Sequence, residues 1–357
     1  MKSYKALAVS VRETWSSLRS LPLLPSWMRG IELGSTPSRE IFRRGNLRLI
    51  EYEAALGVRE REIPIVIIPS MINRHYILDL LPGASFIEAL CLAGFRVYAL
   101  EWLQPHPSDR YMTIDELFER RIAKALDRVA KTSPNGRFHL VGQCLGGTLS
   151  LVEALLRPDR LETLTLMTTP VDFTEAGQLG TWAQSQLDVD LLTDAYGNIP
   201  SSLLQASFKW LRPSLSLNKI RKLASRWRDE EFLRAFLALE MWAVDNVDFP
   251  AECYRFLIEE LYRENKLVKS GVDGGLVVEG RALDLCDLRV PIFDAVASDD
   301  HIVPTSMRLP KFATRENVLR REYRGGHLGA VIGGGARKTF WPELIVWLTS
   351  HEPKSAS

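Results

Sequence analysis

Cysteine is scarce in this chain, and its few cysteines form no recognisable pair. The 357 residues contain four, Cys91, Cys144, Cys253 and Cys286, and no two of them are spaced as C-x-x-C. A chain of this length can bury a large core without disulfides, so we expect free thiols and a reducing, cytoplasmic setting. The six histidines form neither an H-E-x-x-H motif nor a cluster with cysteines, so we expect no metal site.

The chain also lacks an excess of charge and a long apolar run. Its net charge is +1, which argues against a nucleic acid or an anionic membrane surface as partner. No run approaches the roughly 18 uninterrupted apolar residues of a membrane span, so no transmembrane segment is expected. The apolar stretch near the N-terminus is interrupted by Arg12 and Glu13 and lacks a cleavage site, so we expect no signal peptide.

The clearest chemical signature lies in Phe138–Gly147, FHLVGQCLGG. The end of a predicted buried strand leads into the spacing G-x-nucleophile-x-G, with Cys144 where serine is commoner, and then into a predicted helix. Such a turn holds the nucleophile in a strained backbone conformation, and side chains at the flanking glycines would clash. Similar joints occur as plain turns and in nucleotide-binding folds, so this motif alone leaves catalysis open.

Strands and helices alternate on both sides of this motif. Predicted strands are rich in β-branched and aromatic residues, and helices with one apolar face separate several of them. Ile63–Pro69 is continuously apolar, as expected of a strand buried on both faces of a parallel sheet. The strands expected are Leu47–Ala54, Ile63–Pro69, Phe95–Trp102, Phe138–Val141, Leu161–Met167, Val290–Ala297 and Val318–Tyr323. This rhythm predicts an α/β fold with a doubly wound, mostly parallel sheet.

The rhythm changes in the middle of the chain. Between about residues 173 and 280 the periodicity is helical and the stretch is rich in large apolar residues. We therefore expect a helical cap over residues 173–280, inserted into a core formed by residues 46–172 and 281–357, after an N-terminal arm over residues 1–45. A cap over the sheet edge would exclude water from a cleft.

Three candidate catalytic residues follow predicted strands in the order nucleophile, acid, histidine. They are Cys144, Asp300 and His327, and this is the order of the α/β-hydrolase triad. A thiol is mostly protonated at neutral pH, so it needs a base, and the base needs a carboxylate to orient it. From the pattern alone Asp299 competes with Asp300, and His301 competes with His327.

Backbone N–H groups near the nucleophile are candidates for an oxyanion hole. We expect one from Leu145, and a second from the loop after Ile63–Pro69, around Met71 or Ile72, of which we select Ile72. A cysteine nucleophile suits transfer from a thioester to an acceptor other than water, because thioester exchange is close to isoenergetic.

Several motifs resemble the catalytic subunit of poly(3-hydroxyalkanoate) synthases, an acyltransferase branch of the α/β-hydrolase superfamily. Together they extend over most of the chain, from about residue 63 to residue 333. The matching stretches are INRHYILDL from Ile72, GQCLGGT from Gly142, TPVDF from Thr169, GNIP from Gly197, YRENKL from Tyr262, DHIVP from Asp300 and GGH from Gly325. In that family the aspartate directly before histidine belongs to the triad, which favours Asp300 over Asp299. Leu145 departs from the pattern, because glutamine is common at that position.

The resemblance implies a polyester synthase that polymerises (R)-3-hydroxyacyl-CoA and holds the growing polyester as a thioester on Cys144. Acyl-CoA is then a substrate, and no cofactor is implied. The short chain is similar to the two-component synthases, which implies a homodimer, a second non-catalytic subunit and a cytoplasmic location at the surface of polyester granules. The alternatives are a related thiol hydrolase or depolymerase, and a non-catalytic granule-associated homologue.

Overall fold

The computed structural model of the protein describes residues 30–185, 187–211, 221, 223–313 and 316–353. The first 29 residues of the expected N-terminal arm lie outside these ranges.

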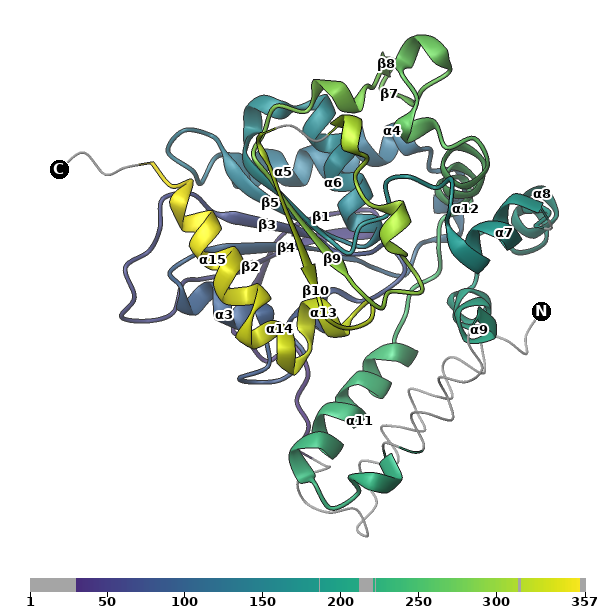
Figure 1. The fold of residues 1–357 in the computed structure, drawn as a ribbon. Helices are drawn as coiled ribbons and strands as arrows, with labels where there is room; N and C mark the ends of the chain where they lie inside the picture. Colours follow the sequence, from purple (N-terminus) through teal and green to yellow (C-terminus); the bar gives the residue numbers. More distant parts are fainter. Residues whose placement is uncertain (1–29, 186, 212–220, 222, 314–315, 354–357) are drawn as a thin grey trace.

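An eight-stranded sheet runs through the centre of the molecule (Figure 1). Its strand order is β1-β2-β4-β3-β5-β6-β9-β10. The pairs β1/β2 and β2/β4 are antiparallel, and every pair from β4 to β10 is parallel. The strands are β1 Arg39–Arg44, β2 Leu47–Tyr52, β3 Ile65–Ile68, β4 Val97–Trp102, β5 Phe138–Gln143, β6 Leu161–Met167, β9 Ile292–Ala297 and β10 Val318–Tyr323. The predicted doubly wound, mostly parallel sheet is confirmed.

Helices cover both faces of this sheet (Figure 1). On one face lie α4 (Ile114–Glu116), α5 (Ala123–Ala130) and α6 (Leu145–Leu156). On the other lie α3 (Phe86–Leu92) and the C-terminal helices α13 (Gly329–Ile332), α14 (Gly334–Lys338) and α15 (Phe340–Ser350).

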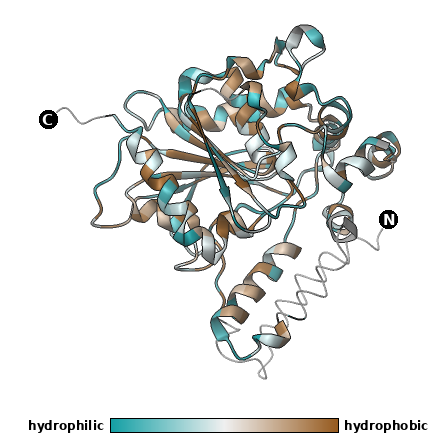
Figure 2. Ribbon diagram, in the orientation of Figure 1, coloured by the Kyte–Doolittle hydropathy of each residue, from teal (hydrophilic) through white to brown (hydrophobic). Residues whose placement is uncertain are grey.

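Strand β3 shows why the apolar run was a good predictor. Val66 and Ile68 pack into the hydrophobic cluster on the α6 side, and Ile65 and Ile67 pack into the cluster on the α15 side. All four side chains are fully buried, because successive residues of a strand point to opposite faces. Figure 2 shows the same concentration of apolar residues in the central strands.

Every strand predicted for the sheet is present, and the edge strand β1 is an addition. Arg39–Arg44 lies in the segment assigned to the N-terminal arm, yet it pairs with β2 at the edge of the sheet. Its burial is low, with four of its six residues exposed, so its sequence carries little apolar signal.

The described residues between positions 173 and 280 are mainly helical, and they lie to one side of the sheet (Figure 1). Its described elements are α7 Gly177–Ser185, α8 Val189–Tyr196, α9 Ser201–Leu211, α11 Glu230–Val244, α12 Ala251–Phe256 and the π-helix Leu257–Arg263. A two-residue strand, β7 (Val277–Val278), pairs with β8 (Arg281–Ala282) at the boundary between this segment and the core. Strands this short have no periodicity to detect.

Candidate active site

Cys144 occupies a sharp turn between β5 and α6. Its backbone has φ 54° and ψ −128°, a conformation that residues other than glycine rarely adopt. The Cys144 N–H donates to the carbonyl of Met167 in β6 at 2.9 Å, which ties the turn to the neighbouring strand. Such strain persists only where the surroundings determine the conformation, and it is typical of functional positions.

The glycines around Cys144 allow three segments to pack closely. A Cβ atom on Gly146 would lie 2.0 Å from the carbonyl oxygen of Ile68, and one on Gly147 would lie 1.9 Å from Oγ1 of Thr169. The corresponding atom on Gly142 would lie 2.4 Å from the Cα of Gly147. Side chains at these three glycine positions would clash with neighbouring atoms, which is the steric reason given above for the G-x-nucleophile-x-G spacing.

His327 and Asp300 meet beside this turn, although 27 residues separate them. Nδ1 of His327 lies 2.7 Å from Oδ2 of Asp300, and both residues are buried. The other carboxylate oxygen, Oδ1, accepts hydrogen bonds from the backbone N–H groups of Ile302 and Val303, each at 2.9 Å. The carboxylate is thus fixed on one side by its own loop, and its second oxygen faces the imidazole.

His327 also interacts with Cys144. Burial lowers the pKa of His327, but the interactions with Cys144 and Asp300 outweigh it and raise the pKa to about 10. The environment therefore stabilises the protonated imidazole, the form that His327 adopts after it accepts a proton. The structure brings together the three residues that the sequence names as candidates, Cys144, Asp300 and His327.

The two competing residues lie elsewhere in their loops. Asp299 is exposed, and its carboxylate accepts from the hydroxyl of Ser298 at 2.9 Å. His301 is only partly buried, whereas His327 is buried and its Nδ1 lies 2.7 Å from the Asp300 carboxylate.

The two residues named for the oxyanion hole come from the start of α6 and from the loop after β3. Leu145 is the first residue of α6, so its N–H has no acceptor within the helix. The N–H of Ile72 points to Oγ of Ser70 at 3.5 Å, the long limit of a hydrogen bond. Met71, the alternative to Ile72, lines the same cavity as Leu145.

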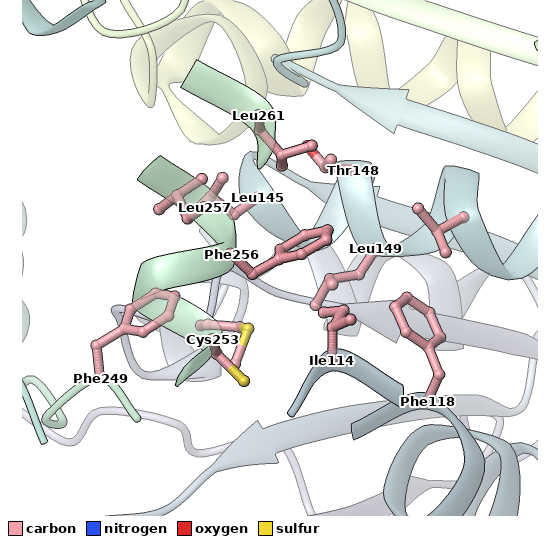
Figure 3. Close-up of a pocket in the computed structure, with 12 residues that line it drawn as sticks. Ile114, Phe118, Leu145, Thr148, Leu149, Phe249, Cys253, Phe256, Leu257 and Leu261 are labelled. Atoms are coloured by element: carbon pink, nitrogen blue, oxygen red, sulfur yellow. The ribbon is translucent and has the colours of Figure 1, made fainter. Parts of the chain in front are cut away.

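That cavity lies between α6 and the cap (Figure 3). Its volume is about 30 Å³. Leu145, Thr148 and Leu149 line it from α6, and residues between Phe249 and Leu261 line it from the cap. The surfaces of α6 and the cap that face each other across this cavity are therefore mainly apolar.

Contacts between the loop after β3 and the end of α11 were not foreseen. Nδ2 of Asn73 donates to Oδ1 of Asn246 at 2.6 Å, and the hydroxyl of Tyr76 donates to Asp245 at 2.9 Å. Nε1 of Trp242 donates to the carbonyl of Arg74 at 2.9 Å. We call this set of contacts the loop–α11 clamp. No local pattern reveals it, since its two sides are about 170 residues apart.

Two motifs quoted from the sequence also meet in space. Nδ2 of Asn265, from YRENKL, donates to Asp172 at 2.9 Å, and Oδ1 of Asn265 accepts from the N–H of Phe173 at 2.9 Å. Asp172 and Phe173 belong to the stretch TPVDF, which follows β6. The first residues of the cap are thereby joined to the end of the π-helix Leu257–Arg263.

In the part of the chain that the structure describes, no helix combines the length and the apolar character needed to cross a membrane. Over the same residues, no group of three or more His, Cys, Asp or Glu side chains is arranged to hold a metal ion.

Comparison with known families gives two matches. Residues 63–331 match the family described as "alpha/beta hydrolase fold", and residues 26–90 match "Poly-beta-hydroxybutyrate polymerase (PhaC) N-terminus". The first match covers well over half of the chain and confirms the predicted α/β-hydrolase fold.

Curated relatives share the name "Poly(3-hydroxyalkanoate) polymerase subunit PhaC". The one from Allochromatium vinosum is 32% identical over 90% of this chain and 90% of its own length, and the one from Thiocystis violacea is 31% identical with the same coverage. The one from Haloferax mediterranei is 31% identical, and the match spans 90% of this chain but only 65% of that longer protein.

Solved structures agree on the fold alone. A soluble variant of monoglyceride lipase from Saccharomyces cerevisiae superimposes with a TM-score of 0.54 at 13% identity, covering 91% of this chain and 98% of the lipase. An alpha/beta hydrolase fold protein from Chitinophaga pinensis gives a TM-score of 0.50 at 14% identity, covering 89% and 98%.

Proposed function

This chain belongs to the PhaC-type poly(3-hydroxyalkanoate) polymerases, which are acyltransferases with the α/β-hydrolase fold, and on that premise we propose that it polymerises (R)-3-hydroxyacyl-CoA. CoA is released, and the polyester grows as a thioester on Cys144. The observation that supports the catalytic part is the 2.7 Å contact between His327 and the buried Asp300, together with the interaction between His327 and Cys144.

In the first half-reaction His327 takes the proton of the Cys144 thiol. The thiolate sulfur attacks the carbonyl carbon of the acyl-CoA thioester, and the N–H groups of Leu145 and Ile72 stabilise the oxyanion that forms. The intermediate collapses, the bond to the CoA sulfur breaks, and CoA leaves as a thiol with the proton from His327. Asp300 stabilises the imidazolium during this exchange.

In the second half-reaction the acceptor is a hydroxyl group. The 3-hydroxyl of an incoming acyl-CoA gives its proton to His327 and attacks the acyl group on Cys144, which forms an ester bond and frees the cysteine. The lengthened acyl-CoA then returns its chain to Cys144 in a further round of the first half-reaction. Water must be kept out for this outcome, and the apolar contact between α6 and the cap supports that requirement.

We also propose how the protein assembles. Relatives of similar length are named as subunits, which supports a two-component synthase with a second, non-catalytic subunit. We propose that the catalytic subunit acts as a homodimer in the cytoplasm, at the surface of the polyester that it makes.

Product analysis tests this function. The purified protein and a Cys144→Ala control are incubated with 3-hydroxybutyryl-CoA, CoA release is followed, and the product is assayed for polymer and for free acid. We expect CoA release and polymer from the unmodified protein only. Free 3-hydroxybutyrate without polymer would identify a hydrolase instead. If no CoA is released, the assay is repeated with a candidate second subunit, and continued inactivity would refute the proposal.

A further inference from the structure

The cavity between α6 and the cap has a mainly apolar lining. Among its lining residues only Thr148 and Cys253 carry polar side-chain atoms. Oγ1 of Thr148 donates to the carbonyl of Pro170 at 2.7 Å, and Sγ of Cys253 donates to the carbonyl of Met112 at 3.4 Å. Because these groups already have acceptors, the cavity suits a small apolar group better than water.

The lining of the cavity on α6 includes the residue that directly follows the nucleophile. Leu145 directly follows Cys144, and Leu145, Leu149 and Val152 lie on one face of α6, one turn apart. Seven residues of helix correspond to about 10 Å of length. Figure 3 shows Phe256 and Leu257 of the cap facing Leu145 and Leu149 of α6 across this space.

Its volume limits what can enter. About 30 Å³ exceeds the roughly 10–15 Å³ that one water molecule needs, and it is far below the roughly 150 Å³ of an engineered cavity that holds benzene. A methyl group fits, and a pentyl chain does not fit unless the lining moves.

We propose that this cavity receives the side chain at carbon 3 of the acyl group on Cys144, and that its lining limits the protein to short side chains. The inference rests on the proposed function, since it names the substrate class of the same site. Leu149 and Phe256 are then specificity-determining residues, one on the core and one on the cap.

A matched pair of leucine variants tests the proposal. Leu149 and Leu151 are both buried in the same helix and the same hydrophobic cluster, but only Leu149 lines the cavity. Initial rates of CoA release are measured with 3-hydroxybutyryl-CoA, which has a methyl side chain, and with 3-hydroxyoctanoyl-CoA, which has a pentyl side chain.

We expect Leu149→Ala to raise the ratio of the octanoyl rate to the butyryl rate by at least about tenfold, since even one methylene in an apolar pocket changes rates by that factor. Leu151→Ala should leave the ratio within about twofold of the unmodified protein. Phe256→Leu, a milder change on the cap, should raise the ratio in the same direction if Leu149→Ala fails to fold. An equal ratio in all four proteins would overturn the proposal.

A second measurement does not depend on turnover. Cys144 is alkylated with N-methyl iodoacetamide or N-hexyl iodoacetamide, and the labelled peptide is quantified by mass spectrometry. Leu149→Ala should speed labelling by the hexyl reagent relative to the methyl reagent by about tenfold, whereas Leu151→Ala should not. If neither thioester releases CoA but this shift occurs, the proposed function fails and the cavity assignment stands. If CoA is released but neither ratio shifts, only the cavity assignment fails.

Discussion

The Asp300 carboxylate is held so that only one of its oxygens is available to His327. Two backbone N–H groups bind Oδ1 at 2.9 Å, and Oδ2 lies 2.7 Å from Nδ1 of the imidazole. This arrangement requires a proton on Nδ1, which leaves Nε2 as the nitrogen that can accept the proton of Cys144. The acid therefore sets the tautomer of the base.

Replacing this acid with its amide should impair activity without unfolding the protein. In Asp300→Asn the amide oxygen can keep the two backbone hydrogen bonds, and its NH₂ group then faces Nδ1 and favours the wrong tautomer of His327. We expect the rate of CoA release to fall by roughly 10³- to 10⁴-fold. The control is Asp299→Asn, an exposed neighbour, which should change the rate less than about twofold. Similar losses in both variants would contradict the assignment of Asp300.

At the scale of elements, the loop–α11 clamp joins the cap to the loop after β3. This loop is the one expected to supply an oxyanion donor, and it is bound by side chains of Asp245, Asn246 and Trp242 at or near the end of α11. Displacing catalytic groups by about 1 Å can cost two orders of magnitude in rate. The position of the cap should therefore affect the chemistry as well as access to the site.

Weakening this clamp should lower turnover more than binding. Tyr76→Phe removes the hydroxyl that donates to Asp245 at 2.9 Å, and we expect kcat to fall by about tenfold while KM changes little. The control is Gln104→Ala, which breaks another contact between core and cap, the 2.6 Å hydrogen bond to Asp248, away from this loop. A change of KM alone in Tyr76→Phe, or an equal fall of kcat in the control, would contradict the role given to the loop.

Across the whole molecule, local sequence patterns predicted the strands of the core, and the structure added the long-range contacts around the candidate site. Three features were predictable because each signal lies within about ten residues. They are the apolar run at β3, the glycines around Cys144, and the loops of Asp300 and His327. Burial on both faces of β3 confirmed that strand, and the close packing at Gly146 gives a steric reason for the glycine spacing. The proximity of Asp300 and His327 follows from the topology, because β9 and β10 are parallel neighbours and their carboxyl ends lie at the same edge of the sheet.

Other features had no local signal. The clamp joins residues about 170 positions apart, and the cavity combines residues from Met71 to Leu261. Strand β1 is polar and pairs at an edge, so its sequence resembles that of a surface segment. Side-chain contacts between cap and core depend on the path of the whole chain, and periodicity does not determine that path.

A buried carboxyl group should make the stability of the fold depend on pH. Glu153 in α6 is almost entirely buried, and burial raises its pKa to about 7 despite the 2.9 Å contact with Arg157. An unfolded glutamate loses its proton near pH 4.5, so between pH 4.5 and 7 the folded state holds more protons than the unfolded state. Stability should therefore fall as the pH rises through this window, by on the order of 3 kcal/mol.

The variant Glu153→Gln removes this titration. Its free energy of unfolding in urea, relative to the unmodified protein, should increase between pH 5 and pH 8. Glu119→Gln, an exposed substitution on the same side of the sheet, should show no such change. A constant difference between Glu153→Gln and the unmodified protein over this range would show that Glu153 titrates normally.

The mass of the protein shows directly whether Cys144 carries the acyl chain. The protein is mixed with 3-hydroxybutyryl-CoA, quenched with acid within seconds and measured by intact mass spectrometry, and the modified peptide is then mapped. The account predicts adducts of one or more 3-hydroxybutyryl units, located on Cys144, lost on treatment with hydroxylamine and missing from Cys144→Ala. CoA release with an unmodified Cys144, or with the adduct on another residue, would contradict it.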